Sequence, residues 1–127
     1  MLNVTALTKQ EVDQCPVRQV LSRVTGKWQV LILLALEGEP LRFGALKRTI
    51  GDITQRVLTQ NLRSLERDGY LTRTVSAGPP LAVTYALTEL GKGVVMPLKS
   101  LVVWAADNHG DILKKRAEFD SAPERAN

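Results

Sequence analysis

The sequence predicts an α+β fold that is mainly α-helical and forms a single domain over residues 1–127. Apolar residues recur at a helical period over residues 53–73, and the pattern changes to a period of two after Gly69. Helical patterning returns from residue 89 onward. One hairpin between helical segments predicts a small antiparallel sheet beside a helical core.

The positive charge of the chain is concentrated in one region. The net charge is +4, and the window from Arg42 to Arg73 contains seven basic and three acidic residues, a difference of +4. This window therefore supplies the whole excess. A local concentration of this kind is typical of a surface that meets a polyanion.

Composition also bears on the compartment. The first residues lack the basic and apolar regions of a signal peptide, and the longest apolar run, residues 30–36, is far shorter than the ~20 residues of a membrane helix. The single cysteine excludes an intramolecular disulfide and fits a reducing compartment. We expect a cytoplasmic protein with no membrane partner.

The N-terminal part is expected to contain an arm and two helices. Residues 1–14 are weakly patterned and would form the arm. Pro16 suits the first position of a helix, and Gly26 ends that helix. The apolar side of this helix consists of Val17, Val20, Leu21 and Val24. Residues 28–36 are apolar almost all round, which predicts a central helix buried on every side.

Two further helices are joined by a glycine turn. Residues 41–42 fit a very short strand before the first of them. The inward residues of this helix would be Phe43, Leu46 and Ile50. Gly51 then supplies the turn into a helix over residues 54–68, whose N-cap is either Thr54 or, in a capping box one turn earlier, Asp52. This order of elements is typical of a helix-turn-helix.

The helix over residues 54–68 has one apolar face and one polar face. The apolar stripe consists of Val57, Leu58, Leu62 and Leu65. The opposite face carries Arg56, Thr59, Gln60, Arg63 and Arg67. Arginine suits guanine edges and phosphates, glutamine suits adenine, and threonine suits phosphate or a thymine methyl group. For this helix taken alone, the alternative is a solvated basic face without a ligand.

Together with the local charge, this chemistry predicts an interface for double-stranded DNA. Candidates for base edges and flanking phosphates are Thr54, Gln55, Arg56, Thr59, Gln60 and Arg63. Candidates for phosphate contacts outside that helix are Lys27, Arg42, Lys47, Arg48 and Arg73. The alternative from another class is a protein-interaction module whose basic face meets an acidic partner.

The segment that follows is predicted to be a hairpin. Residues 71–75 are rich in Thr and Val, and residues 76–80 form a turn cluster. The second strand alternates through Leu81, Val83, Tyr85 and Leu87. A hairpin directly after such a helix makes residues 42–88 a winged helix-turn-helix DNA-binding unit. The tip, residues 76–84, has no Lys or Arg, so we expect the wing to contact DNA through backbone amides or Arg73 only.

The C-terminal segment predicts helices that pair with a second chain. Thr88 is expected to cap a helix over residues 89–108, in which residues 101–106 are apolar around the full circumference. One small core cannot cover all sides of a terminal helix, so we expect a homodimer with dimerisation helices over residues 89–119. In the alternative, the last segment folds back over this helix through Ile112, Leu113 and Phe119. The tail, residues 120–127, is polar and expected to be disordered.

Short motifs in order along the chain resemble one known family, the HxlR-type bacterial winged helix-turn-helix transcriptional regulators. The motifs are Cys15-Pro16-Val17, Gly26-Lys27-Trp28, Arg42-Phe43 with Leu46, Ile53-Thr54 with Leu58-Thr59, Leu62-Arg63-x-Leu65-Glu66-x-Asp68-Gly69-Tyr70, Pro79-Pro80 and Tyr85-x-Leu87-Thr88-x-x-Gly91. The resemblance implies a dimeric DNA-binding regulator whose N- and C-terminal helices form the dimer. A two-fold dimer would bind a pseudo-palindromic operator. The uncharged wing tip departs from the family pattern, and wing contact should be weaker than in relatives with a basic wing.

Cys15 is the one candidate for redox sensing. It precedes Pro16 at a helix N-terminus, where the helix dipole and nearby Arg18 would favour the thiolate, the form that reacts with oxidants and electrophiles. The resemblance implies the same role, because several relatives use a cysteine at the matching position as a switch. The alternative is a small buried apolar side chain.

Other chemistry is not expected. His109 has no neighbouring ligand residues and is interpreted as a helix-end residue, so we expect no metal site. It also pairs with no nucleophile, and the chain has no glycine-rich phosphate loop, so we expect neither an enzyme nor a cofactor. The sequence leaves open a small-molecule effector at the dimer cleft.

Overall fold

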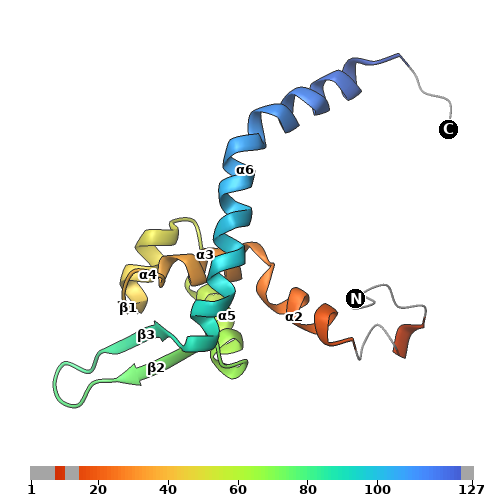
Figure 1. The fold of residues 1–127 in the computed structure, drawn as a ribbon. Coiled ribbons are helices and arrows are strands. Elements are labelled where there is room, and N and C mark those ends of the chain that lie inside the picture. The colour runs from red at the N-terminus through yellow and green to blue at the C-terminus, as the bar shows by residue number, and fades with distance from the viewer. Residues whose placement is uncertain (1–7, 11–14, 124–127) are drawn as a thin grey trace.

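The computed structural model describes residues 8–10 and 15–123 and confirms a mainly helical winged-helix fold (Figure 1). In chain order the elements are α2 (Pro16–Val24), α3 (Lys27–Ala35), β1 (Leu41–Arg42), α4 (Phe43–Ile50), α5 (Gln55–Arg67), β2 (Leu71–Val75), β3 (Val83–Leu87) and α6 (Glu89–Ser121). The expected arm over residues 1–14 lies mostly outside the described residues, as does the tail from residue 124.

The sheet has the strand order β1-β3-β2, and all its pairings are antiparallel. Val75 pairs with Val83, and the backbone N–H of Ser76 donates to the carbonyl of Ala82 at 2.8 Å. The turn therefore closes at Ala82, and the predicted strand start at Leu81 is wrong. Leu81 lies in the turn and is 73% exposed.

The core forms where the apolar sides of α3, α4 and α5 meet the sheet and the start of α6. Its most deeply buried side chains are Ile32, Leu33, Leu46, Ile53, Leu58, Leu62, Leu65 and Val95. The expectation that the helix of residues 28–36 is buried on every side is wrong, because Leu31 is 37% exposed. α3 packs against α2, α4, α5 and α6, which leaves this one strip of its surface uncovered.

The N-terminal helix α2 contributes little to this core. Val24 is its one buried residue, while Val20 and Leu21 are about half exposed. The described part of the chain therefore covers the predicted apolar side only in part, and Val20 and Leu21 on it remain about half exposed.

The N-cap of α5 is Thr54. The Thr54 hydroxyl accepts a hydrogen bond from the backbone N–H of Val57 at 3.2 Å, so Thr54 is the cap and the alternative at Asp52 is wrong. Gly51 and Gly69 flank the helix with φ angles of 98° and 87°, in the region where a Cβ is strained. The two glycine turns therefore fix the orientation of α5 relative to the elements before and after it.

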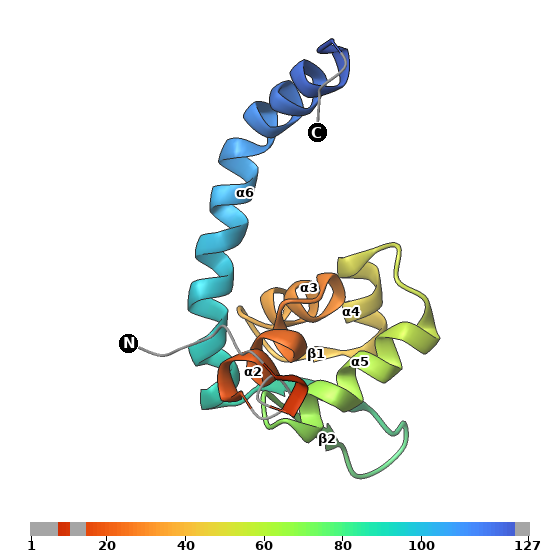
Figure 2. The same cartoon turned by 90° about the vertical axis from the view of Figure 1, so that its right-hand side faces the viewer.

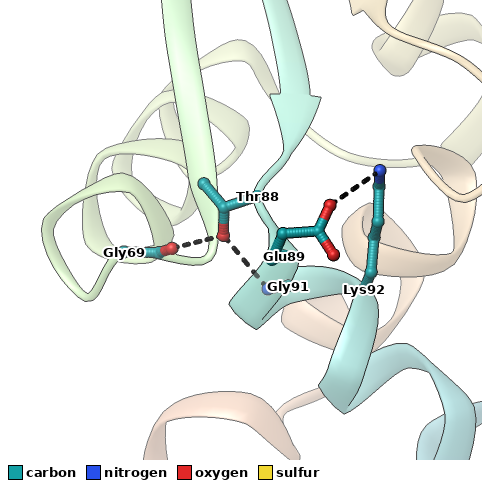
Figure 3. A network of polar contacts seen from close by, with 5 residues as sticks. All are labelled: Gly69, Thr88, Glu89, Gly91 and Lys92. Atoms are coloured by element: carbon teal, nitrogen blue, oxygen red, sulfur yellow. Dashed lines mark hydrogen bonds and ion pairs between the residues drawn. The ribbon is translucent and has the colours of Figure 1, made fainter.

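Thr88 ties the end of α5 to the start of α6 (Figure 3). Its hydroxyl donates to the carbonyl of Gly69 at 2.6 Å and accepts from the backbone N–H of Gly91 at 3.1 Å. Gly91 is buried against the Tyr70 backbone, where a Cβ would collide with the Tyr70 carbonyl. The two helices are thus joined by short contacts rather than by a loose linker.

α6 is one helix of 33 residues, and the predicted end at residue 108 is wrong. It runs through Pro97 and also through His109 and Gly110, so His109 is not a helix-end residue. A single glycine is tolerated inside a helix, and the neighbouring Asp, Lys, Arg and Ala residues continue it. Asp120 and Ser121 are therefore helical, not part of a disordered tail.

Beyond Leu98, α6 leaves the core and projects away from the helical body, as both views show (Figures 1 and 2). The alternative in which the last segment folds back is therefore wrong. Large apolar side chains remain exposed on it, including Leu101, Val103, Trp104, Leu113 and Phe119. No helix within the described ranges has both the length and the apolar character needed to cross a bilayer.

Candidate nucleic-acid interface

The polar face of α5 is presented to solvent. All six predicted base and phosphate contacts on this element are exposed: Thr54, Gln55, Arg56, Thr59, Gln60 and Arg63. The opposite stripe is anchored, since Leu58, Leu62 and Leu65 are at most 1% exposed. Asn61 adds a polar anchor, because its amide oxygen accepts from Gln29 on α3. A rigid helix with a free polar face can insert into a groove without rearrangement.

The basic side chains between Arg42 and Arg73 carry positive charge that no ion pair neutralises within the described residues. Among residues 8–10 and 15–123, none of the seven basic side chains between Arg42 and Arg73 lies within 4.0 Å of a carboxylate oxygen. Asp68 at the end of α5 instead pairs with Arg23 of α2 at 3.9 Å. The positive charge predicted from the sequence is therefore available to an anionic ligand.

The hairpin brings Arg73 to α5. Arg73 pairs with Tyr85 and lies on the same face of the sheet as Leu71, which is buried against the core. Together with α5 it lines a groove of about 400 Å³, whose lining residues are Thr59, Arg63, Glu66, Arg73 and Tyr85. The structure thus unites two predicted base contacts and one predicted phosphate contact in one groove.

The remaining predicted phosphate contacts do not line this groove. Arg42 lies in β1 and precedes α4, while Lys47 and Arg48 occupy the last turn of α4. Arg42 and Arg48 are exposed, and Lys47 is half-buried. Lys27 begins α3, and its ammonium group lies 4.3 Å from the centroid of the Trp28 ring. The phosphate contacts of these four residues therefore stay predictions.

Two groove residues were missed from the sequence. Glu66 is three positions after Arg63, so helical periodicity alone could have placed it beside the polar face. Tyr85 could be placed opposite Arg73 only once the register of the hairpin was known. Glu66 also lines a second groove of about 680 Å³, with Arg23, Arg63, Ser64 and Arg67.

Cys15 lies where the sequence places it, at the N-cap of α2 and directly before Pro16. It is a free, half-buried cysteine, and its side chain does not cap the helix. The described part of the chain holds no group of three or more His, Cys, Asp or Glu residues that could bind a metal ion.

Comparison with known proteins points to one family. The sequence model of the HxlR-like helix-turn-helix family matches residues 23–112. The HTH-type transcriptional regulator YtfH of Escherichia coli (strain K12) is 42% identical over 106 residues, which are 84% of this chain and 84% of that protein.

Solved structures give the same result. The structure of ytfH from Salmonella typhimurium, named as a transcriptional regulator, is 40% identical, covers 83% of this chain and 94% of its own, and has a TM-score of 0.76. The redox regulator HypR in its oxidized form is 35% identical and has a TM-score of 0.70, covering 74% of this chain and 97% of its own. The chain is thus similar to these regulators over most of its length.

Proposed function

Since this chain belongs to the HxlR-like helix-turn-helix family of transcriptional regulators, we propose that it regulates transcription in the cytoplasm as a homodimer that binds a specific DNA sequence. One observation carries the proposal. Thr59 and Arg63 on the exposed polar face of α5 line one groove with Arg73 of the hairpin, and no carboxylate oxygen of the described residues lies within 4.0 Å of these two arginines. The mixture of Arg, Gln and Thr suits base edges as well as phosphates.

In this mechanism α5 enters the major groove. Base contacts are concentrated in its first two turns, because the N-terminal residues of a recognition helix reach the base edges. Thr54, Gln55, Arg56, Thr59 and Gln60 lie there. Arg63 and Arg73, which line one groove of the protein, lie next to these residues. The residues that hold flanking phosphates are Arg42, Lys47, Arg48 and Lys27.

The exposed apolar surfaces of α2 and α6 support the homodimer. Val20 and Leu21 on α2 and the large apolar residues of α6 beyond Leu98 are exposed, and exposed apolar surface of this kind marks a protein–protein interface. A two-fold dimer would present two α5 helices to half-sites about one DNA turn apart, roughly 34 Å.

A gel shift tests the proposal directly. The full-length protein is titrated against the DNA upstream of its own gene, with and without an excess of unrelated competitor DNA. We expect a shifted band that survives the competitor. Binding that the competitor abolishes, or no binding, would favour the alternative, a winged-helix module that meets an acidic protein.

Cys15 supports a second, regulatory role in the same protein. It is half-buried at the N-cap of α2, a helix on which Val20 and Leu21 are about half exposed, and the similar HypR structure is that of an oxidized redox regulator. With one cysteine per chain, oxidation must join the Cys15 thiols of two subunits, or one of them and a small thiol. The two thiols lose two electrons and two protons, which an oxidant such as diamide takes up.

Diamide should lower the operator affinity of the wild type and leave Cys15→Ser unchanged. The physical reason is that a bond or adduct at the start of α2 displaces this helix from its place in the dimer. Gel shifts before and after treatment measure the effect, and a reducing agent should restore binding. An equal loss of affinity in both proteins would exclude Cys15 as the sensor.

A further inference from the structure

Glu66 stands among four arginines at the edge of the interface. It lines the groove that contains Arg63 and Arg73, and also the neighbouring groove that contains Arg23 and Arg67. Among the residues that the structure describes, no other acidic residue lines either groove. A surface that bound phosphates by charge alone would gain affinity from a neutral residue at this position.

The carboxylate of Glu66 is not held in a fixed ion pair. Within the described ranges, no Lys, Arg or His nitrogen lies within 4.0 Å of its oxygens, although Arg63 is three residues away on the same helix. Its neighbour Asp68 differs, because that carboxylate faces Arg23 at 3.9 Å. The Glu66 carboxylate therefore keeps a negative charge in the groove that contains Arg63 and Arg73.

We propose that Glu66 is a specificity residue, whose carboxylate lies in the same groove as Arg63 and Arg73, repels the phosphate backbone and so weakens binding to non-operator DNA. This inference rests on the proposed DNA-binding function. It assigns to Glu66 an effect on the ratio of two affinities rather than a contact with a base.

The surroundings of the Glu66 carboxylate differ between the complex with operator DNA and the complex with non-operator DNA. On non-operator DNA both arginines are attracted to phosphates, which leaves the Glu66 carboxylate unpaired beside the negative backbone. On the operator, Arg63 is directed along the major groove by base contacts, and Arg73 stays between Glu66 and the backbone. The repulsion is therefore larger in the non-operator complex, and the difference favours the operator.

The test compares the wild type with Glu66→Gln, which keeps the shape and removes the charge. Affinity is measured by fluorescence anisotropy on operator DNA and on a scrambled duplex of equal length, each over a series of salt concentrations. For Glu66→Gln we expect scrambled DNA to bind roughly three- to ten-fold more tightly at low salt, with a salt slope steeper by about one unit. Operator affinity should change less than about two-fold, so the ratio of affinities falls.

Glu39→Gln is the matched control. It makes the same change in net charge at an exposed position between α3 and β1, and Glu39 is not among the residues that line the two grooves. An unchanged affinity ratio in Glu66→Gln, or an equal fall in Glu39→Gln, would overturn the inference. So would a loss of operator affinity with scrambled binding unchanged, since Glu66 would then read a base. If the wild type itself does not prefer the operator, the proposed function fails instead.

Discussion

Trp104→Glu should convert the protein from a dimer to a monomer at micromolar concentration. Trp104 is 55% exposed on the part of α6 that has left the core, beside the exposed Leu101 and Val103. Burying a large apolar side chain stabilises a complex by about 1.5–3 kcal/mol, and a two-fold interface contains the residue twice. A buried unpaired carboxylate adds a desolvation penalty. We therefore expect the dimer to lose about 3–6 kcal/mol, roughly two to four powers of ten in Kd.

Sedimentation velocity over a range of concentrations measures this change. Ala117→Glu is the control, because it adds the same charge to α6 at an exposed position that helical periodicity places roughly opposite Trp104. Circular dichroism should show the same helix content in all three proteins. A Trp104→Glu protein that still sediments as a dimer would show that this surface of α6 is not the interface.

The local elements of this fold could be predicted because each carries its own signal. The stripe of α5 has a helical period, Thr54 and Gly69 mark its ends, and residues 71–75 and 83–87 are rich in β-branched and aromatic residues. The C-terminal boundary of α6 could not be predicted in the same way. The residues around Gly110 neither stop a helix nor demand one, so the local sequence is compatible both with a continuous helix and with a turn.

Exposure was harder to predict than secondary structure. An apolar side on α2 predicts burial, but it does not say whether the covering surface belongs to the same chain. The same limit applies to the interface. The polar face of α5 follows from periodicity, whereas the groove it forms with Arg73 depends on the register of Arg73 with Tyr85. Register is a property of the folded hairpin, so Tyr85 was missed as the neighbour of Arg73, whereas Glu66 could have been placed beside Arg63 from helical periodicity.

Arg56→Ala should lower operator affinity and relax the sequence preference at one position of each half-site. Arg56 is exposed in the first turn of α5, directly after the Thr54 cap, where a side chain of a recognition helix reaches the base edges. A bidentate contact between arginine and guanine contributes about 1–3 kcal/mol of discrimination. We therefore expect affinity for the operator to fall roughly 5- to 150-fold, with a much smaller loss on scrambled DNA.

Arg48→Ala provides the comparison, because it removes the same side chain from an exposed position on α4. As a phosphate contact it should weaken binding to operator and scrambled DNA alike and reduce the salt slope by about one unit. The two effects are separated by measuring affinity for a set of operators in which each base pair is replaced in turn. For one of these replacements, the affinity of Arg56→Ala should no longer change, whereas Arg48→Ala should respond to every replacement as the wild type does. If both variants lose affinity evenly across all sequences, α5 holds the backbone without reading bases, and specificity must come from the shape of the DNA.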